Sequence, residues 1–368
     1  MIAPEIIDDI CARVSLVDVI GATVDLRPNG RGEMIGLCPF HHEKTPSFTV
    51  TEEKGFFHCF GCGAHGNVIG FVMRANGVSF PIAVERLRSD AGLNAAPSPE
   101  RVAELQSQQE ERKRNAEAER AEGEAEALAL CKQHGVADGT LAKAYFHTRG
   151  ITTKLPPSLR FASALPYYVP DPDNPKRSKL LGTFPAIIGA VQATDGRIAG
   201  VHRTYLRADG RAKANVPSPK KMAGTCWGGA VRLAKAAPEL AIGEGIETCL
   251  SVAQAMPGLA VWAALSLGNM AGSGQGEGRP HPRLPDKKLQ SPIPDMQRPG
   301  IVLPDDVRSV ILLADSDNGD PENAEALIER AGRRFAAQGR TVRIARAPAE
   351  MDFNDLLMAA DAVRSAAQ

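Results

Sequence analysis

The sequence predicts a multidomain α/β protein: a small metal-binding unit, a helical linker, a mixed α+β core subdomain and a doubly wound α/β sheet. Three observations predict this order. Two Cys/His pairs occur before residue 63, a Glu- and Ala-rich stretch surrounds residue 110, and apolar strand-like runs alternate with helical segments after residue 239. A chain of 368 residues is long enough for two or three domains.

We expect four regions along the chain. They are the metal-binding domain at 1–94, a charged helical linker at 95–130, a basic core subdomain at 131–237, and the sheet domain at 238–368 with a Pro- and Gly-rich insert at 271–304. In the last region, ELAIGE, LAVWAAL, SVILLADSD and TVRIARAP are separated by helical segments. Buried apolar strands that alternate with helices are typical of a parallel, doubly wound sheet.

Composition excludes several classes of protein. Positive and negative charges balance at 43 each, so any nucleic-acid partner must bind a local basic surface. The N-terminus lacks a signal-peptide pattern, and the most apolar stretch, 252–267, is broken by Pro257-Gly258. The 7 Cys include one close pair, which is typical of a reduced compartment with one metal site. We therefore expect a soluble, cytoplasmic protein without membrane association.

The first element carries a pattern of metal ligands. Cys38 and His41 form a Cys-x-x-His pair, and after 17 intervening residues Cys59 and Cys62 form a Cys-x-x-Cys pair. Two close pairs separated by a hairpin-sized segment suit one tetrahedral structural zinc. His42 is the alternative to His41, but the spacing favours His41 because it mirrors the Cys59/Cys62 pair.

Aromatic and basic residues lie around the segment between the ligand pairs: Phe48, Phe56, Phe57 and Phe60, with Lys44 and Lys54. Such side chains can stack on the bases of a single strand and contact its phosphates. The alternative is that most of the Phe side chains form the core of so small a domain.

The stretches CPFHHEKTPSFTV and FHCFGCGAHGNVIGFVM resemble the zinc-binding domain of bacterial and phage primases of the DnaG type. The upstream EIIDDICARVSLVDVIGATVDLRPNGRGEMIGLCPFH resembles the helix and first strand of the same domain. The resemblance implies a zinc-ribbon-like fold that engages single-stranded DNA.

Acidic residues follow three of the predicted strands. Glu244 ends LAIGE, Asp315 and Asp317 end VILLADSD, and Asp352 follows TVRIARAP. Because the carboxyl ends of parallel strands meet at one edge of a sheet, we expect these acids to converge. Carboxylates are the ligands that Mg²⁺ or Mn²⁺ prefers. For each acid taken alone, a turn or a helix cap is the alternative.

The order of these acids resembles a Toprim domain, and AIGEGIETCLSVAQA and ILLADSDNGDPENAEALIERA resemble its first two motifs. The resemblance implies that Glu244, Asp315, Asp317 and Asp352 are catalytic and hold Mg²⁺ or Mn²⁺.

The chain departs from the bacterial pattern at two positions. Thr248 stands four residues after Glu244, where the bacterial enzymes have an Asp, and the last motif has Asn354 in place of a second Asp. The ligands of a second metal therefore stay open among three residues: Glu247, Asn354 and Asp355.

The segment DGRIAGVHRTYLRADGRAKANVPSPKKMAG is similar to the basic subdomain that precedes Toprim in these primases. The resemblance implies that Arg203, Lys213, Lys220 and Lys221 bind substrate triphosphate or template. For Lys213, a solvated loop is the alternative.

Together the resemblances imply a DNA primase, which joins ribonucleoside triphosphates into short RNA primers on a single-stranded DNA template during replication. No Gly-x4-Gly-Lys-[Ser/Thr] motif occurs, so a replicative helicase partner would be a separate chain. Two alternatives stay open: a Toprim-type metal-dependent nuclease, and a non-catalytic zinc- and DNA-binding replication factor.

Overall fold

The computed structural model describes residues 2–30, 32–43, 45–59, 61–62, 64–93, 97–171, 174–276, 278–284 and 288–366. The chain divides into two units. Unit 1 comprises 1–119, 168–180 and 283–288, and unit 2 comprises 120–167, 181–282 and 289–368. Lys44 and Phe60, two of the candidate DNA-contacting residues, lie outside the described residues.

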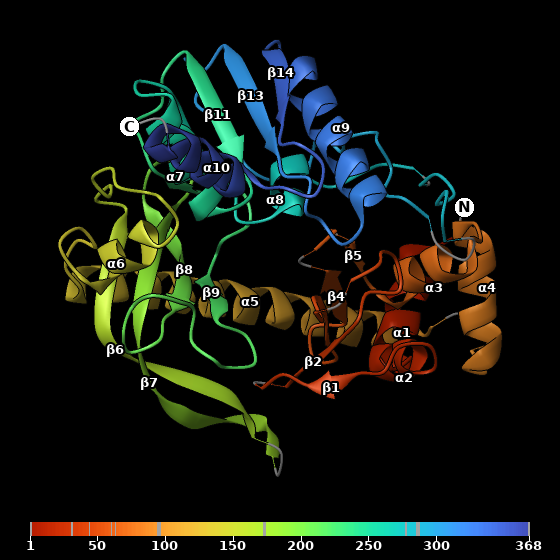
Figure 1. Cartoon of the computed structure of the whole chain (residues 1–368). Coiled ribbons are helices and arrows are strands. Elements are labelled where there is room, and N and C mark those ends of the chain that lie inside the picture. Colours follow the sequence, from red (N-terminus) through yellow and green to blue (C-terminus); the bar gives the residue numbers. More distant parts are fainter. Residues whose placement is uncertain are drawn as a thin grey trace. The chain divides into compact units, whose positions relative to one another are not determined.

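Unit 1 contains a five-stranded antiparallel sheet whose strands pair in sequence order (Figure 1). The strands are β1 (Arg27–Pro28), β2 (Glu33–Gly36), β3 (Phe48–Thr51), β4 (Phe56–Cys59) and β5 (His65–Gly66). The helices are α1 (Pro4–Arg13), α2 (Leu16–Gly21), α3 (Val68–Asn76) and α4 (Phe80–Asp90). Side chains of Ser15 and Asn67 accept hydrogen bonds from the first turns of α2 and α3, which explains where these helices begin.

Phenylalanine side chains form the centre of unit 1. Phe48, Phe57 and Phe71 are buried, and the ring centroids of Phe48 and Phe57 lie 5.2 Å apart. Phe48 and Phe57 are therefore core residues and do not present a stacking surface. Phe56 is 41% exposed, so it is the described Phe between the ligand pairs that can meet a partner.

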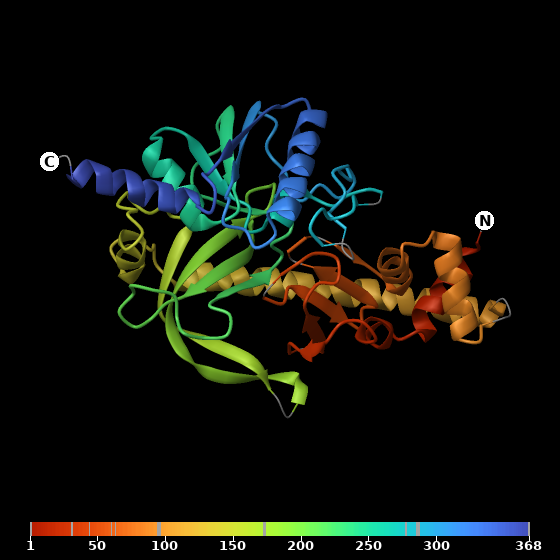
Figure 2. The ribbon, with the colours of Figure 1, turned by 45° about the vertical axis from the view of Figure 1, so that its right-hand side comes forward.

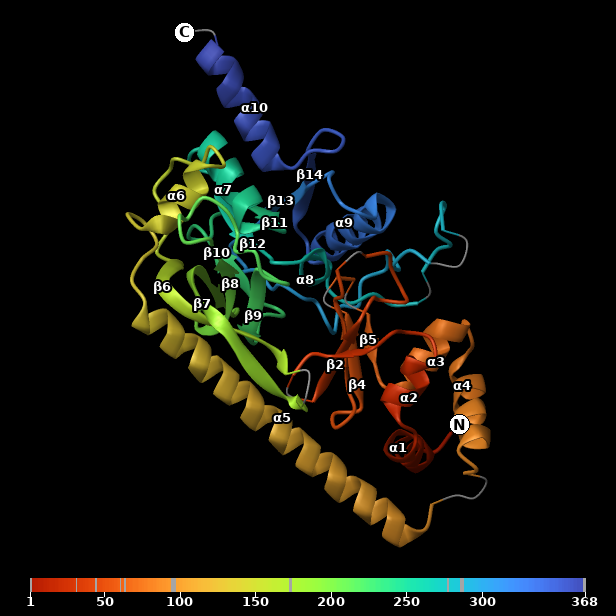
Figure 3. The ribbon, with the colours of Figure 1, turned by 60° about the horizontal axis from the view of Figure 1, so that its bottom comes forward.

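Most of the region predicted as a helical linker, 95–130, lies in the long helix α5 (Pro99–Gln133), which Figure 3 shows from end to end. Most of its side chains are exposed, as its lack of an apolar stripe predicts. In unit 1, Arg101 Nε donates to Asp9 Oδ1 at 3.0 Å. In unit 2, Glu124 pairs with Arg197.

Most of a nine-stranded mixed sheet lies in unit 2, in the order β14-β13-β11-β12-β10-β7-β8-β9, with β6 paired to β7. Residues 168–180, where β6 ends and β7 begins, belong to unit 1. The strands are β6 (Leu159–Asp171), β7 (Asn174–Gln192), β8 (Ile198–Tyr205), β9 (Lys220–Gly224), β10 (Ala230–Arg232), β11 (Glu239–Gly243), β12 (Ala260–Ala263), β13 (Ser309–Ala314) and β14 (Thr341–Arg346). The helices are α6 (Leu141–His147), α7 (Ile246–Ala255), α8 (Leu267–Ala271), α9 (Pro321–Ala337) and α10 (Phe353–Ala366).

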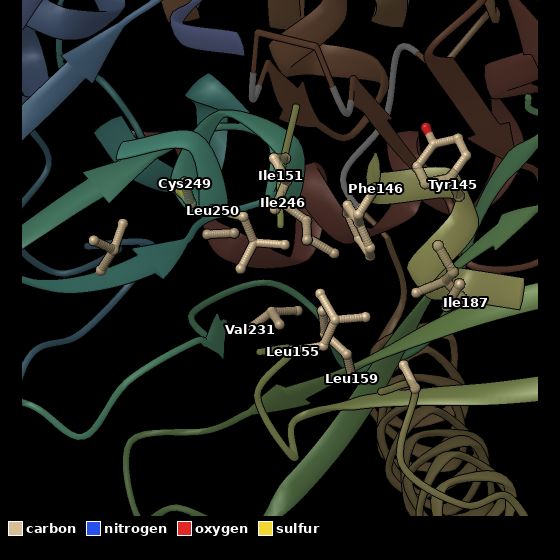
Figure 4. Packing of buried hydrophobic residues seen from close by; sticks show 14 of the residues in the cluster. Tyr145, Phe146, Ile151, Leu155, Leu159, Ile187, Val231, Ile246, Cys249 and Leu250 are labelled. Carbon is tan, nitrogen blue, oxygen red and sulfur yellow. The ribbon is translucent and has the colours of Figure 1, made fainter. Parts of the chain in front are cut away.

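The four strands β11 to β14 are parallel, with helices on both faces. Alternate residues of β11 take part in different cores: Ala241 packs in the cluster that contains α7 residues, whereas Leu240 and Ile242 pack in the cluster that contains α8 and α9 residues. Figure 4 shows the first cluster, where α6 and α7 meet the sheet. The helix α10, dark blue at the C-terminus in Figure 2, packs beside α7. The predicted doubly wound α/β sheet is confirmed.

The sheet continues through the point where we placed a boundary between a core subdomain and a sheet domain, at residues 237 and 238. The strand β10 pairs antiparallel with β12, where Val231 faces Ala263, and also with β7, where Val231 faces Val191. Both regions therefore share one sheet. The apolar runs predict the strands, but the pairing between distant runs depends on the tertiary fold.

The insert at 271–304 is fastened to α9 by two arginines that are almost fully buried. Arg334 donates to the carbonyl oxygens of Met270 and Ile301 at 2.7 and 2.9 Å, and Arg330 donates to that of Ser291 at 3.1 Å. Burial, with Arg340 nearby, lowers the pKa of Arg334 to about 9. Ser291 and Ile301 of the insert are thus held beside α9 through their backbone carbonyls.

We expect the Arg334→Leu variant to lower the free energy of unfolding by about 3 kcal/mol, because two buried carbonyl groups lose their donors. Arg333→Leu is the matched control, since the Arg333 side chain is 52% exposed and pairs with Glu329 on the surface. Chemical denaturation measures both. Equal losses in the two variants would contradict the role of Arg334.

Within the described residues, no single helix is long and apolar enough to cross a membrane. The helices α3 and α4 have the required length and composition only when taken together, and this pair is bent by 114°.

Candidate functional site

Unit 1 brings together all four predicted zinc ligands. Cys38, His41, Cys59 and Cys62 are buried, and their ligand atoms lie within 4.8 Å of one another. The Cys38 and Cys62 Sγ atoms are 3.8 Å apart, and a tetrahedron with Zn–S bonds of about 2.3 Å has an edge of about 3.8 Å. The donor set and its spacing therefore fit one structural zinc.

Neighbouring groups orient the ligands. The Glu43 carboxylate accepts a hydrogen bond from the Cys38 N–H at 2.7 Å and lies 3.2 Å from His41 Nε2. The other ring nitrogen of His41, Nδ1, therefore points toward the thiols and lies 3.7 Å from Cys59 Sγ. A Cβ at Gly61 would lie 2.7 Å from His41 Nε2, so a side chain would displace the ligand. His42 is exposed and outside the group. Sequence reasoning missed Glu43, which the Cys-x-x-His-x-Glu spacing offers as a signal.

Unit 2 contains a pocket of about 860 Å³ at the carboxyl ends of β11 and β13. All four predicted acids line it: Glu244, Asp315, Asp317 and Asp352. Among the described residues, no three of these carboxylates come within 4.8 Å of one another, as expected for like charges.

Burial raises the pKa of Glu244 to about 7, and Asp315 acts in the same direction. Burial also raises the pKa of Asp315 to about 6, although hydrogen bonds from the Thr248 hydroxyl and the Phe353 N–H oppose the shift. Burial raises the pKa of Asp317, again with Asp352 adding to the effect. Clustered acids with raised pKa values are stabilised when a cation is bound.

The structure separates the three candidates for a second metal site. Asn354 is buried and donates to the Arg149 carbonyl at 2.7 Å and to Ser251 Oγ at 3.0 Å, so its amide joins α10 to its neighbours. Asp355 lines the pocket and exchanges hydrogen bonds with Asp352, each carboxylate accepting the other's N–H, at 2.7 and 3.2 Å. Asp352 thus also caps α10, the alternative that its position after a strand left open.

Glu247, the third candidate, is paired with cations. Its carboxylate lies 3.4 Å from Lys220 Nζ and 3.9 Å from Lys213 Nζ, and it accepts the Tyr145 hydroxyl at 2.9 Å. Burial alone would raise the pKa of Glu247, but Lys220 and Lys213 lower it. Its carboxylate therefore holds two lysines at the pocket wall.

The basic residues predicted to bind substrate divide between the two faces of the sheet. Lys213 and Lys220 line the pocket, whereas Arg203 and Lys221 do not. Arg203 and Lys221 face each other across β8 and β9, and Lys221 lies over the Tyr167 ring at 4.2 Å. Adjacent residues in a strand point to opposite faces, so the Lys220-Lys221 pair cannot act as one patch.

The pocket residues that sequence reasoning missed include Arg149, Arg211 and His202. Strand alternation could have found His202, because it lies two residues before Thr204, which faces Lys220. Arg149 and Arg211 lie in irregular segments, where no periodicity indicates direction.

We expect Lys220→Gln to weaken binding of inorganic tripolyphosphate about tenfold, through loss of a charged donor at the pocket. Lys221→Gln should leave the affinity unchanged, because its side chain lies on the other face of β9. Isothermal titration calorimetry of the full chain measures both. An equal loss in both variants would contradict the division between faces.

With these sites described, comparison with known proteins identifies the N-terminal region. Residues 2–102 match the family described as the CHC2 zinc finger. This region is therefore similar to the CHC2 zinc fingers. The match and the buried group of four Cys and His side chains support one structural zinc. Residues 121–233, which follow the CHC2 domain, match a second family, described as a domain of unknown function, DUF7146.

Curated proteins that match part of this chain include DNA primases. One from Haemophilus influenzae is 53% identical over 87 residues, which is 24% of this chain and 14% of the relative. Another, from Neisseria meningitidis serogroup A, is 50% identical over 93 residues, 25% of this chain and 16% of the relative. The chain is thus aligned with about a seventh of the length of these relatives.

Among solved structures, the Aquifex aeolicus primase, with zinc-binding and RNA polymerase domains, is 17% identical with a TM-score of 0.38, covering 99% of this chain and 85% of that one. A DnaG catalytic core is 15% identical with a TM-score of 0.40, covering 64% and 76%.

Proposed function

We propose that the protein is a DNA primase, a nucleotidyltransferase that synthesises short RNA primers on single-stranded DNA. The observation that carries this proposal is one pocket that joins strand-end carboxylates to lysines and arginines, in a chain that also has a CHC2 zinc-finger domain. Acids that can hold a divalent cation beside cations that can hold phosphate are the two requirements of phosphoryl transfer.

We assign Glu244, Asp315, Asp317 and Asp352 as the residues that hold Mg²⁺ or Mn²⁺, with Asp355 as the additional acid at the same wall. These carboxylates fit a hard divalent cation because they are oxygen donors whose mutual repulsion a cation relieves. When bound there, the metal neutralises charge on the reacting phosphoryl group and lowers the pKa of the attacking hydroxyl.

The cationic wall would bind the substrate phosphates. Lys213 and Lys220 would contact the triphosphate, and Glu247 would orient both lysines from beneath, as their distances from its carboxylate favour. Arg149 and Arg211 line the same wall and extend the positive surface toward template or triphosphate. The primer 3′-hydroxyl would then attack the α-phosphate, and pyrophosphate would leave.

In the zinc-finger domain we assign Cys38, His41, Cys59 and Cys62 as the zinc ligands. Single-stranded DNA template would contact the exposed Phe56 by base stacking. Ribonucleoside triphosphates are the proposed substrates, and a replicative helicase on a separate chain is the proposed protein partner. Replication of chromosomal, plasmid or phage DNA would place this activity in the cytoplasm.

Incubation of the full chain with mixed-sequence single-stranded DNA, labelled ribonucleoside triphosphates and Mg²⁺ or Mn²⁺ tests the function. Short labelled RNA, sensitive to ribonuclease and dependent on template, is the expected product. Degradation of the DNA with no labelled RNA would replace the proposal by the nuclease alternative. Failure of the chain to bind ribonucleoside triphosphate in the presence of either metal would favour the non-catalytic, DNA-binding alternative.

A further inference from the structure

His202 is a buried imidazole in the wall of the acidic and basic pocket. It lies in the middle of β8, is only 8% exposed, and lines the pocket together with Lys213 and Lys220. In the sheet it faces Met222 of β9, two positions along from the Thr204–Lys220 pair. Side chains in such diagonal positions share a face, and a long lysine side chain can reach its diagonal neighbour.

One ring nitrogen of His202 lacks a hydrogen bond within the described part of the protein. This nitrogen is Nδ1, which is buried and has no hydrogen-bond partner among the residues that the structure describes. Buried polar atoms in folded proteins nearly always have a partner, so an exception in a pocket wall indicates a missing ligand or water molecule. On either side of His202, Val201 and Arg203 pair regularly with β7, Arg203 with Ile188. A local irregularity of the strand therefore does not explain why Nδ1 lacks a partner.

The ring is neutral at physiological pH. Burial and the charges of Lys220 and Lys213 lower the pKa of His202 to about 3, and Glu247 offsets only part of this effect. A neutral imidazole carries one N–H donor and one acceptor nitrogen. Lys213 and Lys220 already line the pocket and repel each other. The neutral N–H of His202 can donate a hydrogen bond to an anion there without increasing this repulsion.

We propose that His202 is a phosphate-binding residue, which donates a hydrogen bond to the phosphate chain of a nucleoside triphosphate held by Lys213 and Lys220. This inference rests on the proposed function, because it assigns the cationic wall of the same pocket to the triphosphate. The compact group of Lys213, Lys220 and His202 suits the dense charge of a triphosphate, whereas a nucleic-acid backbone spreads its charges along the strand.

Calorimetric titration of the full chain with inorganic tripolyphosphate, and separately with a short oligothymidylate, tests the proposal. His202→Leu removes the donor while filling the buried space, and it should weaken tripolyphosphate binding about 10- to 100-fold. His202→Asn keeps a neutral N–H donor near the position of Nδ1 and should recover most of the affinity. His134→Leu, at a partly exposed position outside the pocket, is the matched control.

Unchanged tripolyphosphate affinity in both His202 variants, with binding intact in the wild type, would overturn the inference and leave the proposed function standing. A loss confined to the oligothymidylate would also overturn it, since the residue would then serve the nucleic-acid backbone. If the wild type bound neither tripolyphosphate nor ATP with Mg²⁺, the proposed function itself would fail. The unfolding temperatures of His202→Leu and His202→Asn are measured as well. Values equal to that of the wild type show that a change in affinity arises in the pocket and not from loss of the fold.

Discussion

Removal of zinc is expected to unfold unit 1 and to leave unit 2 folded. Structural zinc contributes an apparent 10 to 16 kcal/mol, roughly, in small zinc domains, which equals or exceeds the whole stability of a typical domain. Cys59 and Cys62 lie within the same core as Phe48 and Phe57, so loss of the metal exposes the centre of the unit. Unit 2 has separate hydrophobic clusters and should keep its fold.

Elemental analysis of the purified chain should give one zinc atom, and Cys62→Ser should lose it. In limited proteolysis of the Cys62→Ser variant, the first cuts should fall between residue 1 and about residue 119, because this part of the chain forms most of unit 1. Cys11→Ser is the matched control: Cys11 lies in the same unit, accepts a hydrogen bond from Asn67 at 3.3 Å, and is not a ligand. Zinc retained by the Cys62→Ser variant at full occupancy would contradict the assignment.

The second large effect is expected at Asp315. Asp315→Asn preserves shape, and its amide can still accept from Phe353 N–H, which lies 3.3 Å from Oδ1, while losing the negative charge. Because the lost carboxylate is a proposed metal ligand at the end of β13, primer synthesis should fall at least about a hundredfold. Initial rates of labelled RNA formation, measured across Mg²⁺ concentrations, check this.

Asp306→Asn is the control for that experiment, since Asp306 is exposed and does not line the pocket. Thermal unfolding separates loss of activity from loss of fold. Primer synthesis at the wild-type rate in Asp315→Asn would remove Asp315 from the catalytic group, whatever the behaviour of the other acids.

Features that depend on local pattern could be predicted from the sequence. Ligand spacing selected His41 over His42, and the structure buries the first and exposes the second. Apolar runs predicted β11 and β13, and parallel packing then brought Glu244 and Asp315 to one pocket. The two His residues are distinguished by spacing over a few residues. The meeting of Glu244 and Asp315 follows from a general property of parallel sheets, whose strands end at the same edge.

Features that depend on which surfaces meet could not be predicted. Lys220 and Lys221 are chemically equivalent in the sequence, and only the register of β9 against β8 assigns them to different faces. Arg330 and Arg334 resemble the exposed arginines of any amphipathic helix until the insert covers them. Asn354 occupies a metal-ligand position by resemblance, yet its amide is used to hold α10 in place.

The pairing of β10 with β12 bears on how this protein could have been assembled during evolution. The segment 121–233 matches a family by itself and ends just after β10. The strand β12, which pairs with β10 in the sheet, lies outside this segment. A gene that carried this segment alone would encode an open sheet edge that invites aggregation. Recombination should therefore move the segment only together with a strand that can complete β10, so inheritance of the two regions is coupled.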